Sequence, residues 1–167
     1  RDLHSFPTRR SSDLNLWLQR GLIGEIISRF ERKGLKLVGM KMLHMTDEML
    51  SSWYQEHKDK SFFQDLKDFM GQLPIVAMVW EGIDVVPVVR RIVGTTLGRE
   101  AEAGSIRGDF GMSQQFNLIH ASAGEKDAQR EIAIVFKDNE LFNYHGAIDA
   151  VIYAEYEIKA CEGKACK

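Results

Sequence analysis

The run PIVAMVWEG, at residues 74–82, limits the possible folds more than any other part of the chain. Its length and its β-branched residues indicate a buried strand. Asp84 follows as a predicted N-cap, and apolar residues then recur at helical spacing over 85–93, with Arg90 outside the apolar face. A buried strand that leads directly into an amphipathic helix favours a fold in which helices cover a sheet.

The other predicted elements are short and are separated by clear helix signals. Gly34 stands where a C-cap glycine belongs, and Thr46 is a suitable N-cap. The segment 94–116 shows no periodicity, and loops of this length in compact domains are usually functional or disordered. The pattern predicts helices that end before Gly34, begin after Thr46 and cover 59–70 and 124–136, and strands at 35–43 and 117–121.

The order of these elements predicts the fold class. After residue 18 the order is α-β-α-α-β-α-loop-β-α, and one strand in front would complete a βαββαβ frame. That frame is an α+β, ferredoxin-like fold, in which helices cover one face of an antiparallel sheet.

The first residues differ in character from the rest. The stretch HSFPTRRSSDL, at 4–14, is polar, lacks the apolar segment of a secretory signal, and resembles translated sequencing-adapter DNA. We therefore expect an artefactual or disordered leader over 1–18, one domain over 19–157, and a flexible tail over 158–167.

Composition argues against several classes of protein. A formal net charge of −2 gives no global basic field, so no specific nucleic-acid partner is expected. No apolar run approaches the roughly 20 residues of a membrane span, so no membrane partner is expected either. Cys161 and Cys166, the two cysteines, make neither a disulfide framework nor a zinc site. We expect a reducing cytoplasm and no protein-bound metal.

His120, at the end of NLIHA, is the first candidate for chemistry. A lone histidine at a strand end is most often a packed structural residue. A neutral imidazole is also a good nucleophile near neutral pH, provided that a partner on its other ring nitrogen fixes the tautomer. Glu131, in the following predicted helix, is the candidate partner.

Three further residues suit the chemistry of phosphate. Arg90 and Arg107, with Thr96, could stabilise the oxygens of a phosphoryl group in transfer, although each arginine alone would be interpreted as a solvated charge. The chain has neither G-x-x-x-x-G-K-[ST] nor a G-x-G-x-x-G after a strand, so a phosphate site would be of another kind.

In KDKSFF, at 58–63, one aromatic ring could stack on a base.

Five blocks in order resemble the nucleoside diphosphate kinase family: QRGLIGEIISRFERKGLKLVGMKM, KSFFQDL, PIVAMVWEG, GSIRGDFGM and NLIHAS. They extend from about Gln19 to about Phe136. The resemblance implies the βαββαβ fold and an enzyme that transfers the γ-phosphate of a nucleoside triphosphate to a nucleoside diphosphate through a phosphohistidine. It also implies Mg²⁺ carried by the nucleotide phosphates, and a homo-oligomer, either a hexamer or a tetramer.

The resemblance also implies roles for individual residues. His120 matches the phosphorylated histidine and Glu131 the carboxylate that orients its ring. The remaining matches are Ser122 as the hydroxyl beside the histidine, Tyr54 as an active-site tyrosine, Lys60, Arg90, Thr96, Arg107 and Asn117 as phosphate or ribose contacts, and Phe62 with Leu66 as the contacts of the base.

The main departure from the family lies before the first helix. The family's first strand ends in Lys-Pro-Asp, and the register places that lysine at Leu14 and the strand at 6–13. A proline and two arginines there conflict with a central strand, so we expect the strand to be replaced or damaged. Loss of one cationic contact can lower a rate by about 10²–10³-fold.

Two alternatives to an enzyme follow. A non-catalytic nucleotide-binding or scaffold member of the same fold is favoured by the missing lysine and opposed by the presence of His120, Glu131, Arg90 and Arg107. An RNA-binding βαββαβ module is disfavoured because the strand after the long loop lacks the aromatic- and basic-rich signature of such modules.

Overall fold

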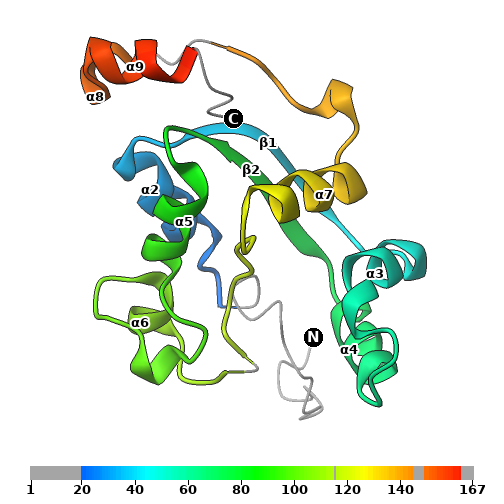
Figure 1. Ribbon diagram of the computed structural model, residues 1–167. Coiled ribbons are helices and arrows are strands. Elements are labelled where there is room, and N and C mark those ends of the chain that lie inside the picture. Colours follow the sequence, from blue (N-terminus) through cyan, green and yellow to red (C-terminus); the bar gives the residue numbers. More distant parts are fainter. Residues whose placement is uncertain (1–19, 115, 145–148, 163–167) are drawn as a thin grey trace, which may run out of the picture.

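The computed structural model describes residues 20–114, 116–144 and 149–162 (Figure 1). The predicted leader at 1–18 lies outside these residues. The described elements are α2 (Ile23–Lys33), β1 (Lys36–Leu43), α3 (Asp47–Trp53), η1 (Gln55–His57), α4 (Phe63–Gly71), β2 (Ile75–Glu81), α5 (Val85–Val93), η2 (Gly98–Glu100), α6 (Ile106–Phe110), α7 (Glu125–Val135), η3 (Asp138–Glu140), α8 (Asp149–Ile152) and α9 (Glu155–Glu162).

Local sequence signals fix the ends of the early elements as predicted. Gly34 ends α2 with a φ of 93°, a left-handed conformation that favours glycine, and its N–H donates to the carbonyls of Phe30 and Glu31. The Thr46 side chain accepts a hydrogen bond from the Met49 N–H at the start of α3. Asp84 stands at the N-cap position of α5, but its φ is 52° and its side chain makes no capping hydrogen bond.

The sheet of the described residues has two antiparallel strands, β1 and β2. Lys36 lies opposite Glu81 and Leu43 opposite Ile75, with an irregularity between Leu37 and Gly39. The chain therefore has the antiparallel sheet of the predicted α+β class. The first strand, predicted at 6–13, falls outside the described residues.

Apolar residues pack on both faces of β2. On one face, Val76, Met78 and Trp80 contact the cluster that contains Ile26 and Phe30 of α2 and the apolar residues of α5. On the other face, Val79 packs with Val135 and Phe136 at the end of α7. A third cluster joins α3 and α4 around Met45, Leu50 and Met70 at the end of the sheet. Helices α2 and α5 cover one face, and α7 lies on the other (Figure 1).

The predicted strand at 117–121 is wrong, because this segment is irregular. Leu118 has a φ of 71°, which breaks an extended backbone. The carbonyls of Asn117 and Ile119 accept hydrogen bonds from the Arg107 side chain. A side chain from α6 thus binds carbonyl groups that a strand would use in a ladder.

The long segment without periodicity is ordered by short helices and their caps. Within 94–116 the chain forms η2 and α6. Ser105 caps α6: its hydroxyl accepts from the Gly108 N–H and donates to the Glu102 carbonyl. This cap holds Arg107 in the first turn of α6, where it reaches the segment before His120.

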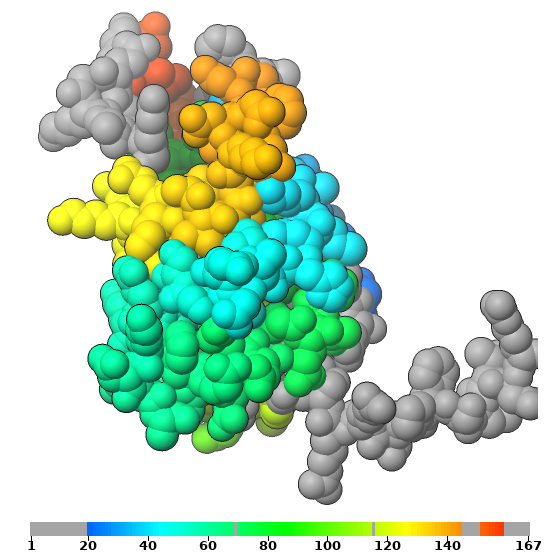
Figure 2. All heavy atoms as spheres, turned by 90° about the vertical axis from the view of Figure 1, so that its right-hand side faces the viewer, coloured from blue at the N-terminus to red at the C-terminus, as the bar shows by residue number. Residues whose placement is uncertain are grey.

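The C-terminal boundary predicted after residue 157 falls inside α9, which runs from Glu155 to Glu162. Within the described ranges, no helix combines the length and the apolar character needed to cross a membrane. Viewed from the side, α3 and α4 form one surface below α7 (Figure 2).

Candidate active site

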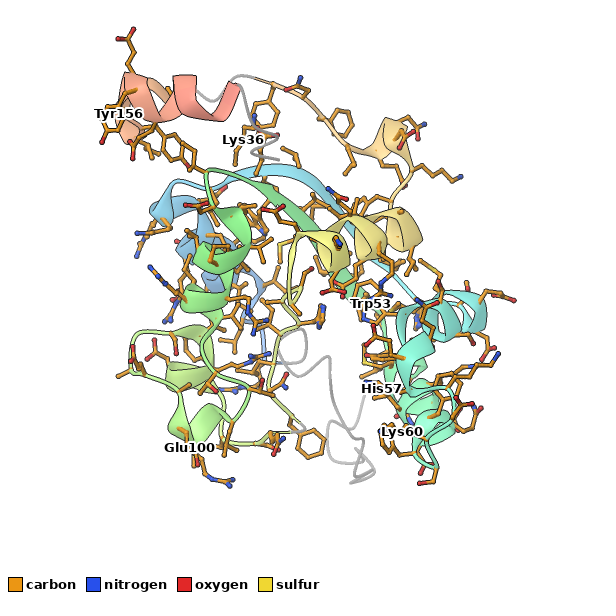
Figure 3. All side chains as sticks on the ribbon, in the orientation of Figure 1. Lys36, Trp53, His57, Lys60, Glu100 and Tyr156 are labelled. Carbon is orange, nitrogen blue, oxygen red and sulfur yellow. The ribbon has the colours of Figure 1, made fainter. Side chains whose placement is uncertain are left out.

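A cavity of about 910 Å³ opens between the α3–α4 hairpin and the segments that follow α5 and α6. The predicted site residues converge on it from five separate stretches of the chain. Its lining includes Tyr54, Phe62, Leu66, Arg90, Thr96, Arg107, Asn117, His120, Ser122 and Glu131. Lys60 is the predicted residue that is not in this lining; its side chain is exposed beyond the end of η1, near His57 (Figure 3).

His120 is held on one ring nitrogen only. Its Nε2 lies 3.0 Å from Oε2 of Glu131, while half of the side chain is exposed. The same Glu131 oxygen accepts a hydrogen bond of 2.6 Å from the Ser122 hydroxyl. A carboxylate on Nε2 favours the tautomer with hydrogen on that atom. The lone pair of Nδ1 is therefore left for a group that enters the cavity.

Trp53 and Arg130 support this pair and were not predicted from the sequence. The Trp53 ring meets the His120 ring edge-on, with centroids 5.3 Å apart. Arg130 donates to the carbonyls of Ser52 and Trp53, at 3.3 Å each, and so connects α7 to the end of α3. Its guanidinium also lies 3.9 Å from Oε1 of Glu131. An aromatic residue in α3 and a charged residue in α7 gave no separate signal in the sequence.

Arg107 is buried, and each of its three nitrogens donates to a backbone carbonyl. Nε donates to Asn117, Nη1 to Gly94 and Nη2 to Ile119. Burial and the nearby charge of Arg90 lower its pKa to about 10. A guanidinium has five N–H groups. Nη1 and Nη2 therefore each keep a second hydrogen that a phosphate oxygen could accept.

Arg90 is the exposed member of the arginine pair. Its Nη1 donates long hydrogen bonds of 3.4 Å to the carbonyls of Ala121 and Ser122, directly after the histidine. Arg90 and Arg107 thus bring two positive charges to the wall that carries His120. A developing negative charge in the cavity would be stabilised by both.

At the other end of the cavity, two of the lining rings, Tyr54 and Phe62, lie on either side of the ring of His57, which is not part of the lining. Tyr54 and His57 lie nearly parallel with centroids 6.5 Å apart, and His57 lies 5.8 Å from Phe62, which is 48% exposed. Burial, with the charge of Glu131, raises the pKa of Tyr54 to about 12. Tyr54 is therefore a neutral donor at physiological pH. The Nδ1 atom of His57 is buried without a hydrogen-bond partner, a feature that the sequence did not reveal.

Comparison of the sequence with known protein families identifies the family to which the chain belongs. The family model described as nucleoside diphosphate kinase matches residues 17–141, three quarters of the chain. The chain belongs to the nucleoside diphosphate kinase family. It is accordingly a phosphotransferase, as the sequence predicted, and the non-catalytic alternative is not favoured.

Individual relatives of this family are similar over most of their length. The nucleoside diphosphate kinase of Parabacteroides distasonis is 53% identical over 127 residues, which are 76% of this chain and 83% of that protein. The nucleoside diphosphate kinase of Archaeoglobus fulgidus is 49% identical over 138 residues, 83% of this chain and 91% of that protein.

Solved structures of nucleoside diphosphate kinases have the same fold. The halophilic enzyme from Halobacterium salinarum, solved with CDP, is 44% identical and has a TM-score of 0.77, over 82% of this chain and 91% of that chain. The enzyme from Borrelia burgdorferi, a transition-state mimic with vanadate and ADP, is 38% identical with a TM-score of 0.73, over 81% and 89%. These matches confirm the predicted fold class.

The Glu131 carboxyl gives this kinase a pH-dependent contribution to stability. Burial raises the pKa of Glu131, but His120, Ser122 and Arg130 together lower it more, so that the net pKa lies below its ordinary value of 4.5. A carboxyl whose pKa is lowered by folding stabilises the folded state when ionised. That contribution is complete above about pH 4.5 and is lost as the pH falls through the folded-state pKa.

We therefore expect Glu131→Gln to be less stable than the parent by about 1–3 kcal/mol at neutral pH, because the hydrogen bonds from His120 and Ser122 lose their charged acceptor, the Glu131 carboxylate. The difference should shrink as the pH falls below about 4.5. Urea unfolding at a series of pH values measures it. Glu100→Gln is the matched control, because the Glu100 carboxyl is exposed at the end of η2 (Figure 3). A stability difference independent of pH would contradict the assigned role of the Glu131 charge.

Proposed function

We propose that the chain transfers the γ-phosphoryl group of a nucleoside triphosphate first to His120 and then to a nucleoside diphosphate. In the first step Nδ1 of His120 attacks the γ-phosphorus in line, a nitrogen–phosphorus bond forms, and the bond to the bridging oxygen of the leaving diphosphate breaks. Nε2 keeps its hydrogen, and the positive charge of the phosphorylated ring is stabilised by Glu131 at 3.0 Å. The acceptor diphosphate reverses these steps.

The observation that carries this proposal is the pair His120–Glu131, facing a cavity with two arginines. Arg90 and Arg107, with the hydroxyl of Thr96, would stabilise the phosphate oxygens. Asn117 and Tyr54 lie on the same lining and would bind the nucleotide, while Ser122 holds the carboxylate. Lys60, outside the lining, would meet the phosphates from the cavity mouth.

We assign Mg²⁺ to the nucleotide rather than to the protein. In the described part of the chain, no group of three or more His, Cys, Asp and Glu side chains could hold an ion. The carboxylate beside the histidine, Glu131, already accepts bonds from His120 and Ser122. The ion would therefore enter on the phosphates of the substrate, where it neutralises part of their charge.

Phe62, with Leu66 beside it, would stack on the base at the cavity mouth. Stacking on a ring face distinguishes bases poorly and is worth roughly 1–3 kcal/mol. Phe62→Ala should therefore raise KM about 5- to 150-fold for purine and pyrimidine nucleotides alike, with a smaller change in kcat. Phe142→Ala, at an exposed ring outside the cavity lining, is the control. A KM that changes for one base only would mean that the residue reads base edges.

The proposal extends to the state of the protein. We place the protein in the cytoplasm as a homo-oligomer, either a hexamer or a tetramer. Self-association, though not the number of subunits, is supported by Met40 and Met42, which lie on β1 with more than half of each side chain exposed. Apolar side chains exposed together on one strand are typical of surfaces that another chain covers. Residues 19–157 would form the folded domain of each subunit. Mass measurement in solution tests the oligomer.

Initial velocities with ATP and several acceptor diphosphates test the activity. A phosphohistidine mechanism predicts parallel double-reciprocal lines, because the first product leaves before the acceptor binds. Values of kcat/KM for GDP, CDP, UDP and dTDP should agree within about tenfold, since the base is held by stacking. Intersecting lines would contradict the two-step mechanism. Nucleotide binding without transfer would establish the non-catalytic alternative instead.

A further inference from the structure

Arg29 of α2, which is not part of the cavity lining, contacts both ends of α6. Its Nη1 donates to the Gly104 carbonyl, 3.1 Å away, directly before the cap residue of α6. Its Nη2 lies 2.6 Å from Oδ2 of Asp109, near the end of the same helix. The guanidinium also lies over the Phe110 ring, 4.8 Å from the ring centroid. One side chain thus joins α2 to the two ends of α6.

Asp109 completes this connection from the other side. Its Oδ1 accepts a hydrogen bond of 2.8 Å from the Gly104 N–H, while its Oδ2 binds Arg29. The Gly104 N–H first, and then the Arg29 guanidinium, hold the pKa of Asp109 below its ordinary value of 3.8. Both side chains are therefore charged at neutral pH, and charged partners make stronger hydrogen bonds than neutral ones. We call Arg29 and Asp109 the α6 clamp.

The α6 clamp attaches α6 to a helix that is itself well anchored. Ile26 and Phe30, on either side of Arg29 in α2, are buried in the core that packs against β2. From α6, Ile106 is buried in the same cluster. A short helix held by one apolar side chain can still turn about that contact, because apolar packing is not directional. The bonds from Arg29 to both ends of α6 remove this freedom.

Arg107 is the residue of α6 whose function depends on this orientation. Its bonds to the carbonyls of Gly94, Asn117 and Ile119 still leave a second hydrogen on Nη1 and on Nη2 for a phosphate oxygen. A hydrogen bond weakens steeply as its angle departs from linear. A displacement of about 1 Å in a group that binds the reacting atoms can lower a rate by roughly 10²-fold.

We propose that Arg29, together with Asp109, is a positioning residue for phosphoryl transfer: it fixes the orientation of α6 and thereby of the Arg107 guanidinium. This inference rests on the proposed function, in which Arg107 contacts the transferred phosphoryl group. Neither member of the α6 clamp lines the cavity, and Phe62, which would bind the base, lies at the other end of it. Loss of the clamp should therefore lower the rate of transfer more than the affinity for nucleotide.

Single-turnover labelling of His120 by γ-labelled ATP tests the proposal on the full chain. Arg29→Met should slow labelling about 10- to 100-fold. The ATP concentration that gives half of the maximal rate should change less than about threefold, since stacking on the base is unaffected. The final amount of label should match that of the parent, because it counts folded sites. A merely structural role would lower the final amount and leave the rate unchanged.

Two further variants accompany Arg29→Met. Asp109→Asn should slow labelling in the same direction, because the amide oxygen still accepts from the Gly104 N–H but the charge that binds Arg29 is lost. Arg32→Met is the matched control: Arg32 is exposed in the last turn of the same helix and lies outside the cavity lining. This control should label at the parental rate.

Combination with Arg107→Lys tests whether Arg29 acts through Arg107. A lysine cannot reproduce the planar fork of the guanidinium, so Arg107→Lys should itself slow labelling. In that background, Arg29→Met should slow labelling by no more than about twofold further, because residues that act as one unit are not additive. Fold-changes that multiply would show that Arg29 acts by another route and would overturn the proposal.

The remaining outcomes separate this inference from the proposed function. If the parent chain is labelled on His120 and Arg29→Met is labelled at the parental rate, the positioning role is wrong and the proposed function stands. If the parent chain is not labelled on His120, the proposed function is wrong, and the inference that rests on it is wrong as well.

Discussion

Replacement of His120 by alanine should lower phosphoryl transfer by about 10⁴-fold or more and remove all label transferred from γ-labelled ATP. The residue is the nucleophile of the proposed reaction, and the loss of a nucleophile removes the covalent route entirely. The folded state should persist, because half of the His120 side chain is exposed and its main link is to Glu131. Steady-state rates and acid-labile protein-bound phosphate measure the effect.

His44→Ala is the matched control for this experiment. His44 is exposed on the connection between β1 and α3 and is absent from the cavity lining. Its replacement should leave both rate and labelling unchanged. Labelling of the His120→Ala protein at the parental level would place the nucleophile elsewhere and invalidate the mechanism.

Arg107→Leu should have the largest effect on stability, about 3–5 kcal/mol. The variant loses three hydrogen bonds from a charged donor and leaves the carbonyls of Gly94, Asn117 and Ile119 without that partner. For a domain of this size the corresponding fall in Tm is roughly 10 °C. Activity should also fall, because the segment that carries His120 loses its attachment to α6. Thermal unfolding with parallel rate measurements shows both effects.

Arg99→Leu separates this effect from a simple loss of charge. Arg99 lies exposed in η2, close in sequence to Gly94, and lines no part of the cavity. The Arg99→Leu substitution should change Tm by no more than about 2 °C, as substitutions of surface residues usually do. If Arg107→Leu were as mild as Arg99→Leu, the three carbonyl contacts would not stabilise the segment as argued.

Where local signals decided structure, the sequence predicted it well. The end of α2 at Gly34 and the start of α3 at Thr46 follow from one residue each. The strand β2 follows from a continuous apolar run. The prediction of a strand at 117–121 was wrong for two reasons. The Arg107 side chain, from another element, binds the Ile119 carbonyl, and Leu118 has a left-handed backbone conformation. Neither is visible in the apolar pattern of NLIHA.

Some contacts of the active site could be predicted from the sequence, and others could not. The pairing of His120 with Glu131 was predicted, because Glu131 lies in the helix that follows the histidine and because both residues match the family. The contacts of Trp53 and Arg130 join α3 to α7, more than seventy residues apart along the chain, and no spacing in the sequence indicates them.

The most direct test of the proposed mechanism is the position of phosphate on the isolated phosphoenzyme. Incubation with ATP, removal of nucleotide at alkaline pH, peptide mapping by mass spectrometry and phosphorus NMR identify the residue and the ring nitrogen. Since Glu131 holds Nε2, the phosphate should be on Nδ1 of His120, with one group per chain at saturation. Phosphate on Nε2, on another residue, or on none would contradict the proposed mechanism.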